Sequence, residues 1–515
     1  MKRRSFFKTA AMAGLAGPLA VKNASAYVVA HNWDKYDFGS GPAVTNRLNQ
    51  GPFPQYAPEA LFPGGDVVMA TTASEEVVPN YGRGLITYIA GDSGTNEIVG
   101  EDKPKEIEEL FKFPLGQKVY IRPTWRELQQ QPGKLNPPDY WKLTLELAKK
   151  YNKAVGFRVQ MRAPDFKEEA LPQFVLDKVP MVKLTEGKWN RNGKTEFFDP
   201  RYDHPVFQDA YKELNGLLAA EYNGNPLVEF IDTFMYGFWG EGHNWPFRGN
   251  VFPDYATAER TWMHMLEVQL EAWSKTPIVT NTQPDFSMVG NSEMLDKTVR
   301  TGNWIRTDSV FIENTQIESL SNRPPWIAAI MEAPLHEARP GAAPPADGIS
   351  ATEQTLRHVI DMGANYCSLW NFHRISAASL ANLYKVCPQV FDDLNRRAGY
   401  NVRPSFIWAW GEQGPGGIIV GLANDGIAGV PGVLCVSVVS QDGKVLAEGG
   451  LDPGYPLPGK IRQALFPLPA GTKWQGLTLK AELEVKGVRH PVRWACRQKT
   501  NPDGSLTLRS NLGRG

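Results

Sequence analysis

The sequence predicts an α/β protein, a (β/α)₈ TIM barrel followed by a C-terminal β-sandwich. Three observations carry this prediction. Short apolar runs alternate with amphipathic helical stretches between residues 84 and 370, which is the pattern of βα units around a parallel sheet. Helical signals stop near residue 400, and strand-like pieces separated by Gly, Pro and Asn follow. The chain has 515 residues, 42% of them hydrophobic, which is enough for a barrel and a second domain.

Residues 1–26 have the features of an export signal. Arg3 and Arg4 lead into a basic Phe-Phe-Lys segment, an apolar run follows at residues 10–21, and small residues at 24–26 form a cleavage site. The paired arginines resemble a twin-arginine signal, and a basic leader for the ordinary secretory route is the alternative. The apolar run is shorter than the roughly 20 residues that span a bilayer. We therefore expect a periplasmic or secreted bacterial protein with no integral membrane segment after signal removal.

The charge balance and the cysteine spacing bear on whether the protein binds nucleic acid, a metal ion or a cofactor. The signal contains five basic residues and no acidic one, so its removal changes the formal net charge from +0 to −5. This balance argues against a nucleic-acid partner. The four cysteines show no metal-ligand spacing, and we expect neither a metal nor a cofactor. In an oxidising compartment a bridge between Cys435 and Cys496 stays open as a prediction.

Residues 27–75 are rich in Gly, Pro and Asn and predict an irregular N-terminal arm, whereas residues 76–395 predict the catalytic barrel. The expected barrel strands are residues 84–89, 118–121, 154–159, 228–236, 278–280, 309–312, 326–331 and 366–370. The clearest expected helices are residues 104–113, 140–151, 206–222, 255–273 and 351–362. Eight units in one run favour a closed barrel.

Residues 400–515 predict the β-sandwich. Strand-like pieces at residues 417–423, 432–439, 444–448 and 477–485 are separated by turn residues. They carry few clustered polar side chains, so we expect this domain to brace the barrel without supplying a catalytic group.

Two glutamates follow predicted barrel strands, where active sites of such barrels lie. Glu241 stands in a glycine-rich and aromatic turn after the fourth strand, and Glu332 directly follows the seventh. Glycoside hydrolysis needs one carboxyl group that is protonated and one that is ionised, on either side of the scissile bond. One acid alone could equally cap a helix. The pair predicts a glycosidase.

The barrel resembles the clan A glycoside hydrolases, which include family 42-type β-galactosidases. That clan places its acid/base glutamate after strand four and its nucleophile after strand seven, matching Glu241 and Glu332. Residues 124–136, Thr-Trp-Arg-Glu-Leu-Gln-Gln-Gln-Pro-Gly-Lys-Leu-Asn, are similar to the clan's Trp-x-Glu-Ile-Glu-Pro segment after strand two. The likeness covers about residues 83–375. It implies a retaining β-glycosidase of a remote family.

Two positions depart from the clan's pattern. An Asn that contacts the sugar 2-hydroxyl usually precedes the acid/base glutamate, and here that position is Gly240. Gln129 and Gln130 replace the Glu-Pro of the second-strand segment. The first departure leaves the 2-hydroxyl contact unassigned.

Further residues are candidates for sugar contacts. The aromatic candidates for stacking are Trp125, Trp239, Trp245 and Trp370, and the polar candidates are His243, His373 and Glu313. Glu313 is also the rival nucleophile. Arginines that could bind an acidic substrate or hold the glutamates ionised are Arg83, Arg122, Arg158 and Arg162, of which Arg158 is the strongest candidate.

The leading interpretation is an exported glycosidase that cleaves oligo- or polysaccharides through Glu241 and Glu332. A non-catalytic carbohydrate-binding protein on a degenerate barrel is the alternative, supported by Gly240. A polysaccharide lyase would need a Tyr or His base beside an arginine cluster. The sugar and the mode of attack stay open, because fold alone does not determine them.

Overall fold

The computed structural model describes a barrel and two C-terminal sheets. The described residues are 41–53, 64–89, 98, 100–166, 168–184, 187–189, 193–249, 251–282, 291–308, 310, 320, 323–335, 350–370, 375–411 and 416–511.

Eight parallel strands close into a barrel in the order β10-β11-β12-β3-β4-β5-β8-β9. These strands are β3 (Gly84–Tyr88), β4 (Lys118–Ile121), β5 (Ala154–Phe157), β8 (Val228–Asp232), β9 (Ile278–Asn281), β10 (Trp304–Thr307), β11 (Ala329–Pro334) and β12 (Tyr366–Trp370). Almost every strand residue is buried, as expected for a parallel sheet covered on both faces. The predicted barrel is confirmed.

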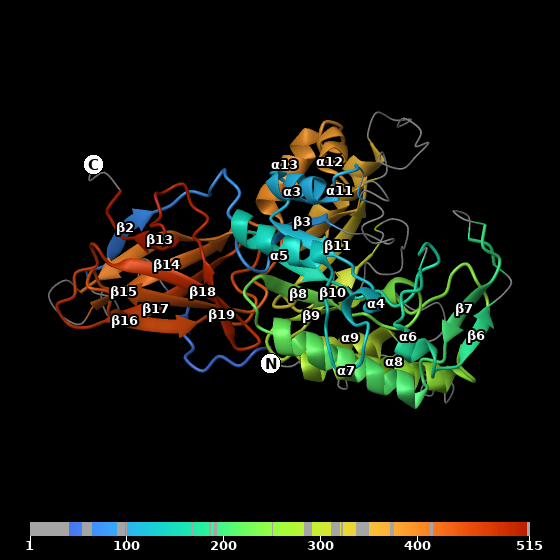
Figure 1. Ribbon diagram of the computed structural model, residues 1–515. Coiled ribbons are helices and arrows are strands. Elements are labelled where there is room, and N and C mark those ends of the chain that lie inside the picture. The colour runs from blue at the N-terminus through green and yellow to red at the C-terminus, as the bar shows by residue number, and fades with distance from the viewer. Residues whose placement is uncertain are drawn as a thin grey trace, which may run out of the picture. The chain divides into compact units, whose positions relative to one another are not determined.

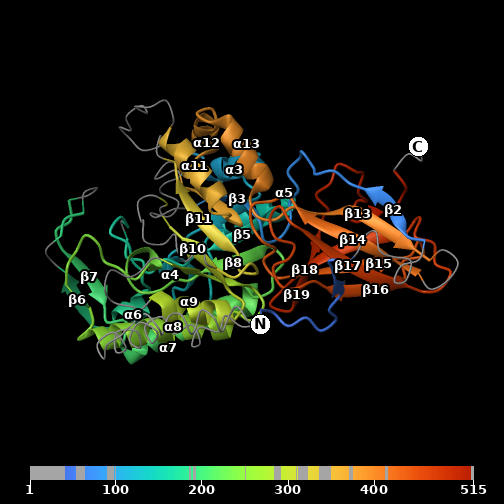
Figure 2. The same ribbon diagram turned by 180° about the vertical axis from the view of Figure 1, so that it is seen from behind.

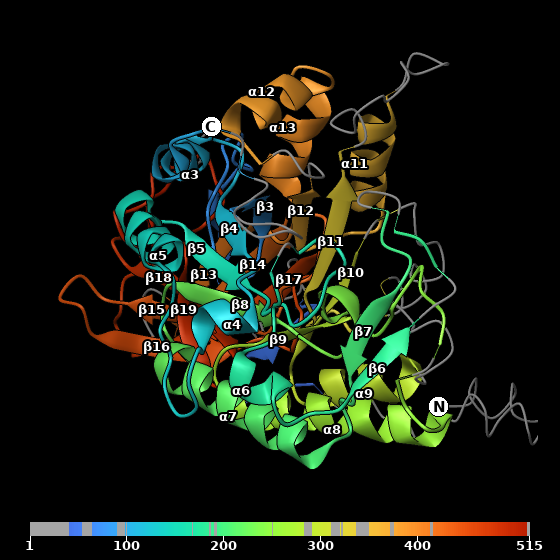
Figure 3. The same cartoon turned by 45° about the vertical axis from the view of Figure 1, so that its right-hand side comes forward.

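Helices lie outside the ring of strands (Figures 1 and 3). They are α3 (Lys103–Lys112), α5 (Asp139–Tyr151), α7 (Pro205–Tyr222), α8 (Tyr255–Ala272), α9 (Asn291–Arg300), α11 (Ala351–Asp361), α12 (Ala377–Tyr384) and α13 (Pro388–Arg397). Local sequence sets several of their ends. Asp102, Asp254 and Ser350 cap α3, α8 and α11 by accepting a backbone N–H, and α5 ends at Asn152 with φ of 51°.

Several strand boundaries differ from the sequence prediction, and the third strand ends at Phe157 instead of residue 159. The sixth strand is β10, which precedes the predicted residues 309–312, and the fourth strand ends at Asp232 instead of residue 236. The seventh begins later than predicted, so Glu332 lies inside β11 instead of after it. The prediction followed apolar runs, whereas β10 contains Arg306, a charged residue that is buried because carboxylates surround it.

The short helix α4 (Trp125–Leu128) follows β4. The segment between β5 and α7 contains the short helix α6 (Gln173–Leu176) and the antiparallel pair β6 (Met181–Leu184) and β7 (Phe197–Pro200).

The C-terminal residues form two antiparallel sheets that fit a β-sandwich only loosely. One sheet has the order β1-β17-β14-β13-β2, and the other has β16-β15-β18-β19 with β20 beside β18. The strands are β13 (Val402–Trp410), β14 (Gly416–Asn424), β15 (Val433–Val439), β16 (Val445–Gly450), β17 (Ile461–Leu468), β18 (Thr478–Val485), β19 (Val488–Val492) and β20 (Leu506–Thr507).

The arm that was expected to be irregular supplies two strands to these sheets. β1 (Asn49–Gln50) pairs with β17, and β2 (Asp66–Ala70) pairs with β13 as the edge strand, as Figure 2 shows. Trp408 and Ile419 form a small core that packs against Phe53 and Val67 of the arm.

Cys435 and Cys496 are buried thiols that form no disulfide, so the open prediction of a Cys435–Cys496 bridge is not met. Among the described residues, no helix has the length and apolar character needed to cross a membrane.

Candidate active site

Polar side chains from seven of the eight barrel strands meet at the carboxyl ends of those strands, the end at which barrel enzymes carry their active sites. The group consists of Tyr88, Arg122, Arg158, Asp232, Asn281, Arg306, Asp308 and Glu332. All are buried, and hydrogen bonds or ion pairs connect them.

A tight turn of residues 237–243 adds Glu241 to this group. Four residues of the turn have φ between 53° and 83°: Gly237, Trp239, Gly240 and Gly242. Residues with a Cβ are strained in this region, whereas glycine is not. A Cβ on Gly237 would lie 2.6 Å from the carbonyl oxygen of His243. Gly240, which stands where the clan usually has Asn, has a positive φ of 81°.

Glu241 has surroundings that favour its protonated form. Its Oε1 accepts from Arg158 Nη1 at 2.8 Å. Burial and the neighbouring charge of Asp308, with which it shares a hydrogen bond, raise the pKa of Glu241 well above its usual range. A carboxyl group held in this way is suited to donate a proton near neutral pH.

His243 contacts Glu241 as a neutral ring. Its Nε2 lies 3.4 Å from Oε2 of Glu241, and its Nδ1 accepts from the backbone N–H of Trp245 at 3.2 Å. Burial lowers the pKa of His243 to about 4, so the imidazole is uncharged at neutral pH. The hydrogen bond at Nδ1 leaves the ring proton on Nε2, directed at Glu241.

Glu332 has more cationic surroundings. Its Oε1 accepts from Arg306 Nη2 at 2.8 Å, from the Tyr88 hydroxyl, and from Arg122 Nη2 at 3.5 Å. Burial and Asp308 raise the pKa of Glu332, but Arg306 and Arg122 oppose that shift. Three donors on one oxygen hold the carboxylate in a fixed orientation.

Asp308, which the sequence analysis did not single out, lies between the two glutamates. Burial disfavours its charge, yet Arg306 and Arg158 hold the pKa of Asp308 far below its usual range. Its Oδ2 accepts from Arg158 Nη2 at 3.1 Å and from Asn281 Nδ2 at 2.8 Å. Arg158 therefore holds Glu241 and Asp308 on its two terminal nitrogens.

Arg306 and Asp308 were missed because the sixth strand was placed too late in the chain, whereas Tyr88 was counted only as part of the apolar run of the first strand. The signal was present: Trp304 and Ile305 form a short apolar start before Arg-Thr-Asp. A strand ending at residue 307 would have put Asp308 at the strand end, where the two glutamates were sought.

Aromatic side chains lie beside Glu241. Trp239 packs at 5.8 Å from Trp189 between ring centroids, and Trp189 lies 6.1 Å from Trp245. Trp245 is 57% exposed, and Trp370, at the end of β12, is partly exposed. Flat aromatic faces of this kind suit the C–H faces of sugars.

Of the remaining residues that the sequence suggested for sugar or acid binding, those that the structure describes are not part of this group. Trp125 is fully buried against Phe207 and donates to Gln129, so it belongs to the protein core. Arg83 precedes β3, at the opposite end of the barrel, and donates to the backbone of Ala398. Arg162 pairs with Asp199 and Glu169. Glu313 and His373 fall outside the described residues.

The described residues contain no group of three or more His, Cys, Asp or Glu side chains arranged to hold a metal ion. The arrangement provides one carboxyl group whose pKa is raised well above its usual range and a second carboxyl group bound by guanidinium groups.

Comparisons with known proteins return similar folds. No family model matches the chain. No curated protein sequence matches it. Among solved structures, the β-galactosidase from Rahnella sp. R3 is 12% identical with a TM-score of 0.41, over 64% of this chain and 59% of that one. The β-galactosidase from the haloarchaeon Halorubrum lacusprofundi is 10% identical with a TM-score of 0.42, over 62% of this chain and 59% of that one.

A third structure, endo-glycoceramidase II from Rhodococcus sp., is 11% identical with a TM-score of 0.37, over 78% of this chain and 100% of that one. The chain thus spans less than two thirds of the length of either β-galactosidase. Similarity at this level assigns no family, so the functional argument rests on the site.

Proposed function

We propose that this protein is an exported, retaining glycoside hydrolase in which Glu241 is the acid/base and Glu332 the nucleophile. The observation that carries the proposal is the contrast between the two glutamates. Both are buried at one end of the barrel, and burial and Asp308 raise both pKa values, but the pKa of Glu241 is raised well above its usual range, whereas Arg306, Arg122 and Tyr88 oppose the shift at Glu332. Carboxyl groups in contrasting surroundings are the requirement of this chemistry.

The reaction has two steps. Glu241 donates its proton to the leaving oxygen while an oxygen of Glu332 attacks the anomeric carbon, which breaks the glycosidic bond and forms a glycosyl ester. Glu241, now ionised, then takes a proton from water, and the water oxygen attacks the same carbon and releases Glu332. Two inversions give a product of retained configuration, and both glutamates return to their initial states.

Residues around the glutamates have supporting roles. The Nε2–H of His243 and the guanidinium group of Arg158 orient Glu241, and the Tyr88 hydroxyl orients Glu332. Trp239, Trp245 and Trp370 supply faces for sugar stacking. A carbohydrate is the partner that this arrangement suits, and the reaction needs no cofactor. The export-signal features of residues 1–26 support a substrate in the periplasm or outside the cell.

The test is a screen of aryl glycosides and plant or algal polysaccharides with the purified protein, with Glu332→Gln as the control. Proton NMR of the first product should show the anomer of the substrate. A crystal structure should place the two carboxyl groups about 5–5.5 Å apart, whereas a gap of about 6.5–9.5 Å would indicate inversion. A product of inverted configuration, or full activity in Glu332→Gln, would contradict the proposal.

One observation favours a second candidate, a carbohydrate-binding protein without activity. Residue 240 is a glycine with positive φ, so it has no side-chain amide for the 2-hydroxyl contact that the clan makes through Asn. A protein that binds an oligosaccharide with micromolar affinity but releases no product, with binding unaffected by Glu332→Gln, would support this alternative.

A further inference from the structure

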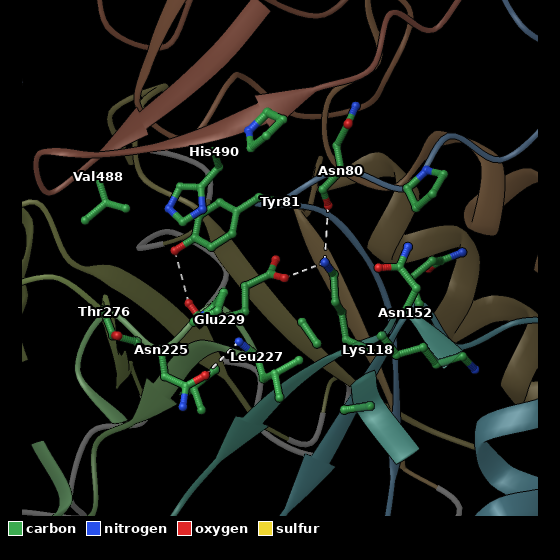
Figure 4. A pocket seen from close by; sticks show the side chains of 18 of the residues that line it. Asn80, Tyr81, Lys118, Asn152, Asn225, Leu227, Glu229, Thr276, Val488 and His490 are labelled. Atoms are coloured by element: carbon green, nitrogen blue, oxygen red, sulfur yellow. Dashed lines mark hydrogen bonds and ion pairs between the residues drawn. The ribbon is translucent and has the colours of Figure 1, made fainter. Parts of the chain in front are cut away.

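A cleft of about 600 Å³ opens at the end of the barrel opposite to the glutamates. Its walls include Lys118 at the start of β4, Val228 at the start of β8, the end of α5, and β19 of the C-terminal sheet (Figure 4). The volume lies in the range of small-molecule pockets, roughly 300–1,000 Å³. Because it is formed at the amino ends of the strands, the cleft is separate from the candidate active site.

The cleft is locally basic in a chain with no net charge. Its acidic residues are Glu229 and Asp503. Its cationic residues are Lys118, Lys149, Lys153, Lys275, Arg489 and Arg493. Six cations facing two acids create a positive potential that concentrates anions.

Two of these cations are neutralised by the protein. Lys118 pairs with the buried Glu229, as the dashed line in Figure 4 shows. Arg489 pairs with Glu448 at 2.5 Å and with Glu484 at 3.1 Å. The charges of Lys118 and Arg489 are therefore already balanced by carboxylates of the protein, and neither requires a bound anion.

The other four cations, Lys149, Lys153, Lys275 and Arg493, form no ion pair within the described part of the chain. Lys149 and Lys275 are exposed, whereas the Nζ of Lys153 donates to the carbonyl oxygen of Phe113 at 3.0 Å. Burial lowers the pKa of Lys153 to about 8. A bound anion would supply the missing negative charge.

Uncharged groups in the same cleft suit a sugar. Tyr81 stacks on His490 with ring centroids 3.5 Å apart and planes at 7°, and both rings are partly exposed. Asn152 and Asn225 contribute amides to the wall (Figure 4). Amides bind hydroxyl groups, and cations bind carboxylates or sulfates.

We propose that this cleft is a second binding site for an acidic oligosaccharide, one that carries carboxylate or sulfate groups. The assignment of a glycan rests on the proposed function, whereas the preference for an anion rests on the cleft alone. A site at this end of the barrel would hold one part of an acidic polysaccharide while another part reaches the glutamates.

The test measures binding by titration calorimetry, with tetragalacturonate as the acidic probe and galactotetraose as the neutral one. The double variant Lys149→Ala/Lys275→Ala should bind tetragalacturonate at least about tenfold more weakly, because it removes two charged donors. Lys460→Ala/Lys473→Ala, which removes two exposed lysines outside the cleft, is the matched control and should bind like the wild type. Thermal unfolding checks that both variants are folded.

The proposal is overturned if the wild type does not bind tetragalacturonate, if the neutral probe binds equally well, or if both double variants lose binding equally. Tighter binding of a short single-stranded DNA through the same lysines would also overturn it. Calorimetry does not require turnover. If the acidic probe binds through Lys149 and Lys275 in a protein that hydrolyses no glycoside, this site stands and the hydrolase proposal fails.

Discussion

Glu241 and Asp308 share the terminal nitrogens of Arg158, with contacts of 2.8 Å and 3.1 Å. Two buried carboxyl groups so close together cannot both ionise easily, so one proton is shared between them. The cations near Asp308 keep that group ionised, and Glu241 keeps the proton. Asp308 is therefore a positioning residue that acts through Glu241.

Replacing Asp308 should change the pH dependence of the reaction. The charge of Asp308 raises the pKa of Glu241, so Asp308→Asn should lower that pKa. In the proposed mechanism catalysis requires protonated Glu241, so the fall of kcat/KM on the alkaline side should begin at lower pH in the variant. The measurement is a pH profile with a neutral aryl glycoside.

The control is Asp296→Asn, which removes a carboxylate paired with Arg300 on the surface of α9. Its profile should match the wild type. An Asp308→Asn variant that is folded and slower at every pH by the same factor would contradict the positioning role.

The two glutamates should respond differently to removal. Glu332→Ala loses the covalent step for every substrate, and azide should restore only turnover to an inverted product. Glu241→Ala loses the general acid, worth about 10²–10⁴-fold, and should be affected least at the first step with substrates that have good leaving groups. The glycosyl-enzyme should then accumulate, and azide should accelerate its breakdown with retention.

These outcomes are read from initial rates and from NMR of the azide products. Near-normal activity in Glu332→Ala together with loss in Glu313→Ala would move the nucleophile to Glu313. Wild-type rates in both Glu241→Ala and Glu332→Ala would refute the glutamate mechanism.

At the scale of elements, two loops differ in what they contribute. The segment after β4 resembles a substrate-binding motif in sequence, but its residues mainly stabilise structure. Thr124 and Glu127 form a capping box on α4, and Gln129 bonds to Trp125 and Glu213. The turn of residues 237–243 instead positions a candidate catalytic group, and its backbone is strained at Trp239.

Adding a side chain to that turn should destabilise it. Gly240→Ala should lower the free energy of unfolding by about 1–2 kcal/mol, because φ is 81° and a Cβ would lie 3.2 Å from the Met235 nitrogen. Glu241 should also shift, so kcat should fall. Denaturant unfolding and initial rates give the two measurements.

Gly216→Ala is the matched control. Gly216 lies within α7, where a Cβ has open space, so alanine should stabilise the protein by up to about 1 kcal/mol. Equal free energies of unfolding for the two variants would show that the turn tolerates a side chain at position 240. The presence of glycine there would then not be explained by backbone strain.

For the molecule as a whole, the C-terminal sheets are joined to the barrel by buried polar contacts. Lys486, at the turn between β18 and β19, donates to the Trp273 carbonyl oxygen at 2.7 Å and to Asn303 Oδ1 at 2.8 Å. Both partners belong to loops at the amino ends of barrel strands. A sheet attached there stabilises the barrel without approaching the glutamates.

Lys486→Ala should therefore reduce stability and leave activity intact. Loss of two hydrogen bonds from a mostly buried ammonium group should cost about 1–3 kcal/mol of unfolding free energy. Lys480→Ala, which removes a half-exposed lysine paired with Asp503, should change it by less than about 0.5 kcal/mol. A lower kcat/KM in Lys486→Ala at a temperature where the variant is folded would contradict the bracing role.

The sequence by itself determined the barrel, most of its helices and the choice of Glu241 and Glu332. The spacing of apolar residues along the chain is a local property, so it can be recognised in the sequence alone. Both glutamates stand in segments next to clear apolar runs, so the sequence alone marks them as candidates.

Only the tertiary structure decided which charges surround those glutamates and where the arm lies. Asp308, Arg306 and Tyr88 come from strands far apart in the chain, and a buried charge in a strand contradicts the apolar pattern unless its partners are known. The strand β2 could not be predicted from the sequence, because it also depends on contacts with distant parts of the chain. An edge strand is stabilised by pairing with β13, more than 300 residues away, and that pairing leaves little trace in the local sequence.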